Sequence, residues 1–306
     1  MIKAPYYKFS EFLKEKYGRK IYKIPVNIPC GCPNRDGTKG TGGCIFCGEE
    51  AAGFETLESS VSVRNQLQRN IEYMGPKYKA DGFIAYFQNY SNTYLDFKLF
   101  KEYINDACIE GVVAIYISTR PDCIYEYHAE FLKQISRKNN VDIVVEMGLQ
   151  STNDVTLKFL NRRHSVEDFF ISAKILQNYG LGVCAHMISD LPMEDILQVE
   201  KNAKRLSDAG IDQVKCHSLY ILKDTVLGDM YNDGKLKMLD CSEFIDRTIA
   251  FLRNLDKSIT VQRLMGRAPK DRTLFCNYCR SWRAVVDEIE AKMHQNNWCQ
   301  GDLLSK

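Results

Sequence analysis

Long apolar runs are missing from this 306-residue sequence. A membrane-spanning helix needs about 20 consecutive, predominantly apolar residues, and no stretch of the chain approaches that length. The first residues, MIKAPYYKFSEF, also lack the apolar core of a secretion signal. We therefore expect no signal peptide, no membrane partner and a cytoplasmic location.

A surplus of charge of one sign is also missing. The chain has 41 Lys and Arg residues against 39 Asp and Glu residues, a net charge of +2, so bulk charge identifies no partner. Glycine-rich dinucleotide, Walker and hydrolase-elbow motifs are absent, which disfavours the cofactor and hydrolase chemistry tied to them. The hydrophobic fraction of 45% is typical of a globular protein with a sizeable core.

Cysteine, in contrast, is abundant, with 12 residues. Without a secretion signal, reduced thiols or metal ligands are a better interpretation than a disulfide framework. Isolated cysteines among apolar neighbours, namely Cys108, Cys184, Cys216 and Cys241, fit the role of small buried hydrophobic residues. The cysteines of residues 30–47 do not fit that role.

Short apolar runs alternate with longer amphipathic stretches along most of the chain, which predicts a parallel sheet covered by helices. The predicted strands are Ile24–Ile28, Phe83–Phe87, Val112–Ile117, Val141–Met147, Gly182–Ile188 and Gln213–Leu219. The predicted helices are Ser62–Tyr73, Phe97–Glu110, Tyr125–Arg137, Val166–Tyr179, Leu197–Ala209, Ser242–Leu255 and Arg283–Gln295. Six strand–helix units with right-handed crossovers predict an α/β fold, a partial (β/α)6 TIM-type barrel. Periodicity alone leaves a flat, doubly wound sheet open as the alternative.

Two segments are predicted along the chain. Residues 1–255 form the barrel, with the cysteine loop at residues 30–47. The alternation stops near residue 256, and residues 256–283 carry seven Lys and Arg residues against two Asp. Residues 256–306 are therefore predicted to be a small basic extension that can contact the substrate or RNA.

The cysteine loop carries the chemistry. Residues 30–47 read CGCPNRDGTKGTGGCIFC and follow the first predicted strand. Three thiolates would hold an iron–sulfur cluster and leave one iron open, as a catalytic centre requires. Zinc with Cys30 as fourth ligand is the alternative, because both metals take thiolates. Placement at the carboxyl end of a barrel strand favours a catalytic centre over a structural zinc site.

The C-x11-C-x-x-C spacing, with an aromatic residue before the last cysteine, resembles the widened motif of one branch of the radical S-adenosylmethionine (SAM) superfamily. That branch includes the Elongator catalytic subunit and the oxygen-independent coproporphyrinogen oxidases, and the loop looks like that of the YhcC/YtqA-type bacterial family. The resemblance continues through FQNYSNTY (87–94), STRPDC (118–123), VEMGLQS (145–151), NRRH (161–164), CAHMISDLP (184–192), VKCHSLYILKDT (214–225) and VQRLMG (261–266).

The resemblance implies a [4Fe–4S] cluster on Cys32, Cys44 and Cys47, with Cys30 outside the ligand set, and SAM chelating the open iron. Phe46 would then pack beside the adenine. The remaining implied SAM contacts are Gln88, Asn89, Asn92 and Thr93 for the amine, Arg162 for the carboxylate, and Gln150 or Glu146 for the ribose. From the residues alone, Glu146 can equally be a buried partner of an arginine, and Arg162 a solvated surface residue.

The residues 188–194 depart from the glycine-rich turn of the family. Asp190 and Met193 stand where the family has glycines, so the adenine pocket is expected to be tighter or differently shaped.

Candidate catalytic residues lie at predicted strand ends. His186 and His217 each close an apolar run, where a histidine is either a catalyst or a hydrogen-bonded core residue. Arg120 can bind an anionic substrate group or be an exposed charge, and the same holds for Lys223. Tyr90, Tyr94 and Tyr220 can stack on a base. A second C-x-x-C, Cys276 to Cys279, and the later Cys299 are expected to bind no metal.

The resemblance further implies action on the wobble uridine of tRNA. It implies removal of the carboxymethyl group of 5-carboxymethylaminomethyluridine to give 5-aminomethyluridine, with flavodoxin or ferredoxin as low-potential electron donor. A radical enzyme acting on a small metabolite or peptide, and a non-enzymatic zinc-binding RNA module, are the alternatives. The sequence does not indicate an oligomeric state.

Overall fold

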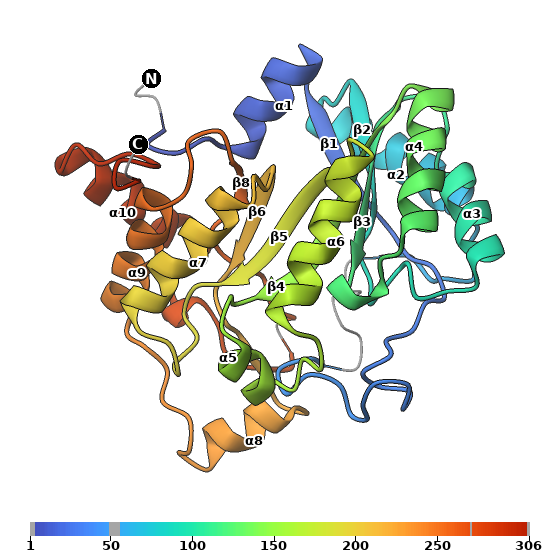
Figure 1. The fold of residues 1–306 in the computed structure, drawn as a ribbon. Helices are drawn as coiled ribbons and strands as arrows, with labels where there is room; N and C mark the ends of the chain where they lie inside the picture. The colour runs from blue at the N-terminus through green and yellow to red at the C-terminus, as the bar shows by residue number, and fades with distance from the viewer. Residues whose placement is uncertain (1–3, 49–55, 270, 305–306) are drawn as a thin grey trace.

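The computed structural model describes residues 4–48, 56–269 and 271–304. Seven parallel strands form one sheet in the order β1-β2-β3-β4-β5-β6-β8. These strands are β1 (Ile21–Val26), β2 (Gly82–Phe87), β3 (Val112–Thr119), β4 (Asp142–Gln150), β5 (Gly182–Ile188), β6 (Gln213–His217) and β8 (Thr260–Arg263). The sheet curls into an open barrel, which confirms the predicted partial TIM-type fold (Figure 1).

Helices connect consecutive strands and cover the outer face of the sheet (Figure 1). They are α2 (Val63–Tyr78), α3 (Phe97–Asp106), α4 (Glu126–Asn139), α5 (Asp154–Phe159), α6 (Val166–Asn178), α7 (Ile196–Asp208), α8 (Val226–Asn232) and α9 (Cys241–Arg253). Side-chain oxygens accept backbone hydrogen bonds at several helix starts, as Ser165 does for α6 and Asp240 for α9. In the described part of the chain, no helix is long and apolar enough to cross a membrane.

One strand of the sheet was missed by the sequence analysis. Strand β8 lies beyond residue 255 and pairs in parallel with β6, with Gln213 beside Thr260 and Val214 beside Val261. It is only four residues long and ends in the polar residues Gln262 and Arg263, so its periodicity is too short to detect. The sheet therefore has seven strands instead of six. The division of roles at residue 255 stays a prediction.

Alternating side chains divide each strand between two cores. On β2, Phe83, Ala85 and Phe87 pack outward with the helices, whereas Ile84 and Tyr86 belong to a second cluster inside the barrel. Helix α1 (Phe9–Tyr17) packs against this inner cluster through Leu13. The amino-terminal end of the barrel is thus filled with apolar side chains, and polar residues can gather only toward the carboxyl ends of the strands.

The two ends of the described chain meet beside β8. The backbone N–H of Gln300 donates to the carbonyl of Pro5 at 2.9 Å, and Val261 donates to Tyr7 at 2.9 Å (Figure 1). Helix α10 (Trp282–Gln295) packs on α9. A two-stranded sheet of β7 (Ile221–Leu222) and β9 (Thr273–Phe275) ties the basic extension to the turn after β6. Two short 3₁₀ helices, η2 (Pro121–Cys123) and η3 (Asn277–Cys279), complete the elements.

Candidate active site in the open barrel

A cavity of about 800 Å³ opens at the carboxyl ends of the strands. All seven strands of the main sheet and the cysteine loop contribute to its wall. Predicted site residues in the wall are Cys32, Cys44, Phe46, Cys47, Gln88, Arg120, Glu146, Gln150, Arg162, His186 and His217. Side chains predicted from seven separate segments of the sequence therefore meet in one place, as expected for an α/β barrel.

The cysteine loop is held against the mouth of the barrel by backbone hydrogen bonds. Ile45 N–H donates to the Leu160 carbonyl at the end of α5, and Leu227 N–H of α8 donates to the Ile45 carbonyl at 2.8 Å. Within the loop, the Arg35 guanidinium donates to the carbonyls of Cys47 and Gly48 at 2.8 and 2.6 Å. These contacts fix the turn that carries Cys44 and Cys47.

Two glycines of the loop are required by its shape. Gly43 has a φ of +81°, in the left-handed region that other residues avoid. A Cβ atom at Gly40 would lie 2.5 Å from Oδ1 of Asn34, a buried residue whose Nδ2 donates to the Asn161 carbonyl and faces the Cys44 sulfur at 3.6 Å. Glycine thus lets the loop close tightly around Cys44.

Cys30 is placed apart from the other three cysteines. Its thiol donates to the carbonyl of Asn89 at 3.3 Å, and it is not part of the cavity wall. Burial raises the pKa of the Cys30 thiol to about 12. The exclusion of Cys30 from the ligand set stays a prediction.

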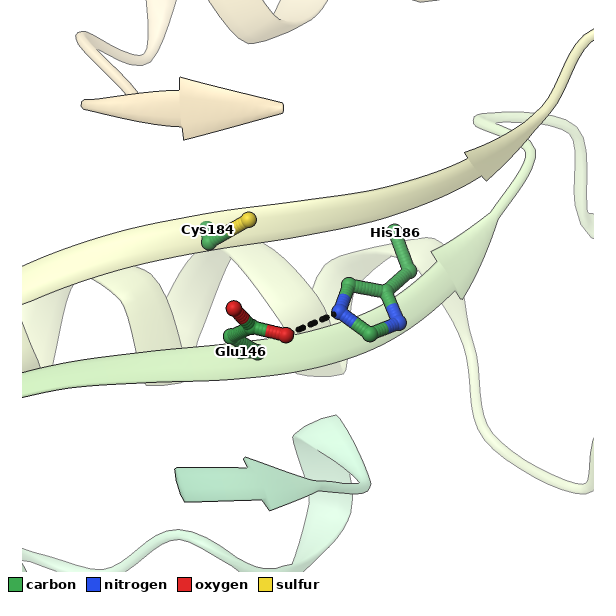
Figure 2. A group of neighbouring side chains, drawn as sticks. All are labelled: Glu146, Cys184 and His186. Carbon is green, nitrogen blue, oxygen red and sulfur yellow. Dashed lines mark hydrogen bonds and ion pairs between the residues drawn. The ribbon is translucent and has the colours of Figure 1, made fainter. Parts of the chain in front are cut away.

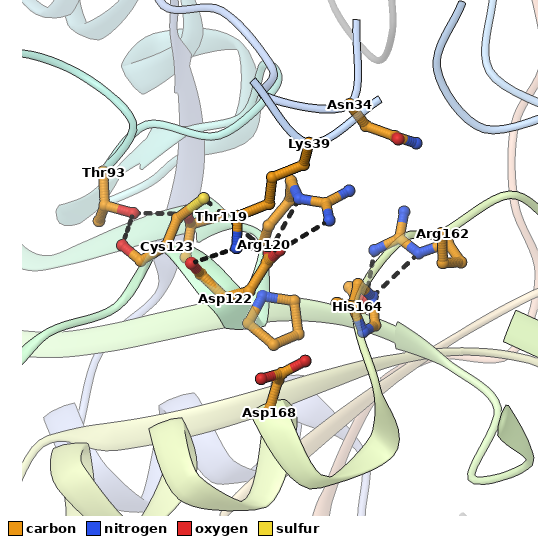
Figure 3. Close-up of polar contacts among 12 residues, drawn as sticks. Asn34, Lys39, Thr93, Thr119, Arg120, Asp122, Cys123, Arg162, His164 and Asp168 are labelled. Carbon is orange, nitrogen blue, oxygen red and sulfur yellow. Dashed lines mark hydrogen bonds and ion pairs between the residues drawn. The ribbon is translucent and has the colours of Figure 1, made fainter. Parts of the chain in front are cut away.

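Arg162 is buried beside Cys44, and Figure 3 shows it with His164. Its Nη1 lies 3.2 Å from the Cys44 sulfur, Nη2 donates to the Gly148 carbonyl, and Nε donates to Nε2 of His164 at 3.1 Å. Burial lowers the pKa of His164 to about 3, so the ring stays neutral and can accept this hydrogen bond. His164 was quoted only as part of the NRRH motif, and its orienting contact was not anticipated. The surface alternative for Arg162 is wrong.

Arg120 presents a free donor to the cavity. Two of its guanidinium nitrogens bind Asp122 at 2.9 Å each, and Lys39 pairs with the same carboxylate at 2.7 Å (Figure 3). The remaining nitrogen, Nη1, is buried and has no hydrogen-bond partner among the described residues. A buried N–H of this kind requires an acceptor, so the site favours an anionic or carbonyl group at this point.

The residues of the motif FQNYSNTY have two kinds of position. Some line the cavity, and others hydrogen-bond to the backbone of the turns beside it. Gln88 lines the cavity, whereas Asn89, Asn92 and Thr93 do not. Nδ2 of Asn92 lies within 3.1 Å of the carbonyls of Phe87, Asn89 and Ser118, and Thr93 donates to the carbonyl of Cys123. These side chains fasten the turn after β2 to the turn after β3 (Figure 3 shows Thr93 with Cys123). A direct contact between them and SAM stays a prediction.

Gln150 closes β4 in an unusual conformation. Its φ is +75°, and the register of β4 with β5 shifts between Gly148 and Gln150. A non-glycine residue in this region costs roughly 1–3 kcal/mol, and such positions gather at functional sites. A Cβ at Gly148 would lie 3.0 Å from both Arg162 Nη2 and Gln150 Nε2, so glycine makes room for both side chains.

Glu146 lies deeper in the barrel and is fully buried. Oε1 accepts from Lys23 at 2.8 Å and Gln262 at 2.9 Å, and Oε2 accepts from His186 at 2.8 Å and Lys215 at 2.9 Å. Burial alone would raise the pKa of this carboxyl, but Lys215 and Lys23 outweigh it and hold the pKa well below its usual range. Four donors occupy the acceptor positions of the carboxylate, which argues against the predicted ribose contact.

Glu146, Cys184 and His186 come close enough together to suggest a metal site (Figure 2). The two lysines on Glu146 make this electrostatically unfavourable, because a divalent cation would lie beside two buried ammonium groups. Burial also raises the pKa of the Cys184 thiol well above its normal value, which disfavours the thiolate that a metal needs. We therefore assign this group to the polar network of the barrel.

His186 and His217 face each other, with ring centroids 5.3 Å apart. Burial lowers the pKa of His186 to about 4, and burial together with Arg263 holds the pKa of His217 well below its usual value. Both rings are thus neutral near pH 7. The Nε2–H of His186 points to Glu146, and Nδ1 of His217 accepts from Arg263 at 2.7 Å. Their catalytic roles stay predictions.

Sequence analysis missed five residues of this deeper network: Lys23, Tyr86, Lys215, Gln262 and Arg263. Lys23 and Lys215 interrupt the strands IYKIPV and QVKCH. Lys215 is two positions before His217 and therefore faces the same side of the sheet. A charged residue within an apolar strand, in step with a strand-end histidine, was the signal that could have revealed it.

The other singled-out residues are scattered. Tyr90 and Tyr220 line the cavity, whereas Tyr94 and the exposed Lys223 do not. Cys276 is half-buried, and Cys279 and Cys299 are exposed. That these three thiols bind no metal stays a prediction.

The departure at residues 190–193 lies outside the cavity wall. Met193 is partly exposed, and Asp190 is buried. Oδ1 of Asp190 accepts from the backbone N–H of Leu219 at 2.6 Å, and Oδ2 accepts from the Tyr278 hydroxyl at 2.6 Å. The aspartate therefore connects β5 to the turn after β6 and to the carboxyl-terminal extension.

Asp190 predicts a pH-dependent stability. Burial raises its pKa to about 7, against about 3.9 in an unfolded chain. Between these values the folded state keeps a proton that the unfolded state loses, so this group makes stability fall as pH rises from about 4 to 7. We expect Asp190→Asn to reduce that fall by at most about 2.5 kcal/mol between pH 5 and pH 7.5, measured as the free energy of unfolding in denaturant at these two pH values. The exposed Asp208→Asn is the control, and equal slopes in both variants would contradict the assignment.

A family model described as the radical SAM superfamily matches residues 26–206, and one for the radical SAM C-terminal domain matches residues 211–295. The chain belongs to the radical SAM superfamily. This radical SAM protein is 30% identical to the uncharacterized protein YtqA of Bacillus subtilis, over 98% of its own length and 93% of that protein. It is 26% identical to the protein YhcC of Escherichia coli K12, over 97% and 95% of the two chains.

Similarity extends to larger proteins named for tRNA. A tRNA uridine(34) acetyltransferase of Methanocaldococcus infernus is 30% identical over 54% of this radical SAM protein, which spans 31% of that relative. The structure of the Elp3 protein of the same organism, lacking residues 1–46, superposes with a TM-score of 0.69 at 18% identity. The match covers 92% of the present chain and 64% of that chain. This structural likeness shows the shared fold.

Radical SAM proteins use a [4Fe–4S] cluster and SAM, which excludes the non-enzymatic zinc module. Cys32, Cys44 and Cys47 all line the same cavity. Ligands of one tetrahedral zinc at about 2.3 Å lie about 4 Å apart, whereas Cys32, Cys44 and Cys47 do not all lie within 4.8 Å of one another. The free Nη1 of Arg120 and the guanidinium of Arg162 lie on the same cavity, as an amino-acid carboxylate would require.

Proposed function

We propose that this radical SAM enzyme acts on the wobble uridine of tRNA and converts 5-carboxymethylaminomethyluridine into 5-aminomethyluridine. The observation that supports a tRNA substrate most directly is the 30% identity, over more than half of the chain, to a protein named for action on uridine 34 of tRNA. A base inside a stacked helix cannot reach a barrel interior, so the nucleotide must be splayed out of the anticodon loop.

We assign the cofactors to the part of the cavity that the cysteine loop lines. Cys32, Cys44 and Cys47 would hold the cluster, and Phe46 would pack on the adenine. Gln150 would contact the ribose, while Arg162 and the free Nη1 of Arg120 would hold the carboxylate of SAM. When bound, the cluster and SAM would supply a 5′-deoxyadenosyl radical that removes a hydrogen atom from the substrate, at the carbon next to its carboxylate. Loss of one further electron from that carbon would give an imine, and its hydrolysis would release the two carbons as glyoxylate and leave the primary amine, with SAM as the two-electron oxidant overall.

The protein itself positions the cofactor and the substrate and excludes water from the interior of the barrel. Gln88 and Tyr90 lie in the turn after β2 and line the cavity, where they can orient the cofactor and stack on a splayed base. The apolar inner core under α1 seals the other end of the barrel. We further propose a cytoplasmic location and a low-potential donor, flavodoxin or ferredoxin, in keeping with 12 free cysteines.

Nucleoside analysis tests the proposal. The protein is reconstituted anaerobically and incubated with SAM, a reductant and bulk tRNA from a strain that lacks its own copy of the gene. We expect 5-carboxymethylaminomethyluridine to fall and 5-aminomethyluridine to rise together, at least tenfold above a reaction without SAM, by mass spectrometry. Formation of 5′-deoxyadenosine with an unchanged anticodon nucleoside profile would contradict the tRNA assignment and favour a small metabolite or peptide substrate.

A further inference from the structure

The deeper part of the cavity carries more positive than negative charge. Lys23 and Lys215 both pair with the single carboxylate of Glu146, at 2.8 and 2.9 Å. Arg263, on the adjoining strand β8, also lines the cavity and forms no ion pair within the described residues. Three cationic side chains are therefore balanced by one anion.

Arg263 has hydrogen-bonding capacity to spare. Its Nη2 donates to Nδ1 of His217 at 2.7 Å, but Nε is buried and finds no acceptor in the described part of the chain. Burial lowers the pKa of Arg263, yet a guanidinium remains charged at neutral pH. A buried guanidinium with an unused N–H costs about 1–3 kcal/mol unless a ligand supplies the acceptor.

Lys215 shows the same electrostatic imbalance. Burial, together with the nearby charges of Lys23 and Arg263, lowers its pKa to about 7 against the opposing effect of Glu146. Its ammonium also donates to the Tyr86 hydroxyl at 2.6 Å. An incoming anion would favour the charged form of Lys215 and would satisfy Arg263 at the same time.

We propose that Arg263 and Lys215 form a subsite for a carboxylate of the substrate, positioned among β4, β6 and β8 and distinct from the carboxylate site of the cofactor at Arg120 and Arg162. The inference rests on the proposed function, because the group to be removed from the wobble uridine ends in a carboxylate. Arg263 supplies the unpaired N–H and Lys215 the second cation, while Glu146 keeps Lys215 in place. The subsite explains how the enzyme distinguishes a carboxymethylaminomethyl group from the aminomethyl product, which has no negative charge.

A competing explanation is purely structural. Arg263 also orients His217, so its loss could disturb the barrel without any ligand. A structural role would weaken the binding of every RNA to a similar degree. A carboxylate subsite would instead weaken only the binding of RNA that carries the carboxylate.

The experiment measures equilibrium binding to two synthetic anticodon stem–loops. One carries 5-carboxymethylaminomethyluridine at the wobble position, and the other carries the neutral primary amide of the same group. We expect the wild-type enzyme, with cluster and SAM in place, to bind the carboxylate RNA about 10- to 100-fold more tightly, because charge-assisted hydrogen bonds contribute about 1.5–3 kcal/mol. Arg263→Gln should remove this preference and keep the affinity for the amide RNA, whereas Arg263→Lys should retain part of it.

The matched control is Arg69→Gln, which removes the same charge from an exposed position on α2. It should keep the full preference for the carboxylate RNA. Lys215→Gln provides a second variant if Arg263→Gln does not fold, and it should also reduce the preference. Equal binding of the two RNAs by the wild type, or an equal loss for both RNAs in Arg263→Gln, would overturn the subsite.

Failure of the proposed function gives a different pattern. A carboxylate preference without conversion of the wobble uridine would leave the subsite standing and contradict the proposed reaction. Conversion of the wobble uridine without any carboxylate preference would support the proposed reaction and contradict the subsite. If neither RNA binds to the wild type, both proposals are wrong.

Discussion

Replacement of Cys44 by alanine is expected to abolish both cluster retention and the formation of 5′-deoxyadenosine. Cys44 is buried in the wall of the cavity, between the guanidinium of Arg162 at 3.2 Å and the amide of Asn34 at 3.6 Å. These donors orient the Cys44 sulfur, which a methyl group cannot replace. Loss of one of three ligands should lower the iron content after anaerobic reconstitution to less than about one tenth of the wild-type value. The absorbance near about 400 nm, from thiolate-bound iron, should fall with it.

Two cysteines provide matched controls for this result. Cys30→Ala removes a thiol from the same loop that hydrogen-bonds to the Asn89 carbonyl, outside the cavity wall. Cys279→Ala removes an exposed thiol from the second C-x-x-C pair. Both variants should keep the cluster and form 5′-deoxyadenosine at near wild-type rates. If Cys30→Ala loses its iron and Cys44→Ala keeps it, the ligand assignment is wrong.

Replacement of Glu146 by glutamine is expected to destabilise the folded enzyme strongly. The change leaves the ammonium groups of Lys23 and Lys215 without their only ion-pair partner in the described chain. Removal of one member of a buried charge pair costs about 3–5 kcal/mol, because the other charge stays buried without compensation. We expect a loss of this size in the free energy of unfolding at pH 6, measured by denaturant titration under anaerobic conditions.

The loss in the free energy of unfolding caused by Glu146→Gln should depend on pH. The pKa of Lys215 is about 7 in the wild type and should fall further when its carboxylate partner is removed. At pH 8.5 the amine is neutral in the variant, so the cost of its burial is smaller than at pH 6. The control is Glu288→Gln, which breaks an exposed ion pair with Arg280 and should cost less than about 1 kcal/mol at either pH. A loss from Glu146→Gln as small as that of the control would contradict the role of the carboxylate.

The sequence predicted the strands and helices whose apolar residues follow a regular local spacing. Val112–Ile117 and Gly182–Ile188 are short runs of apolar residues, and the structure confirms both as strands, the first extended to Thr119. The sequence did not reveal β8, because a strand of four residues, the last two of which are the polar Gln262 and Arg263, carries too little periodic signal. The neighbour that makes it a strand, β6, lies more than 40 residues earlier in the chain.

Site residues could likewise be predicted where the signal is local, but not where the position of the side chain depends on distant partners. The spacing of Cys32, Cys44 and Cys47 lies within one loop, so a short motif sufficed to single them out. Asn92 belonged to a motif of the same kind, yet its side chain turned out to join three backbone carbonyls away from the cavity. A motif identifies which segment reaches the site, but side-chain direction depends on partners such as Ser118 that the motif does not contain.

The sequence by itself determined the alternation of parallel strands and helices, the cysteine loop after the first strand and the resemblance to a radical SAM branch, because periodicity and short spacings are local properties of the chain. Periodicity left a flat sheet open, and the tertiary structure decided for a sheet that curls into an open barrel. The charged interior was decided only by the tertiary structure. Lys23 meets Glu146 across 123 positions of sequence and Gln262 across 239. Their charges become informative only when the curled sheet removes them from water and leaves them one carboxylate to share, and this shortage of negative charge is what points to an anionic substrate group.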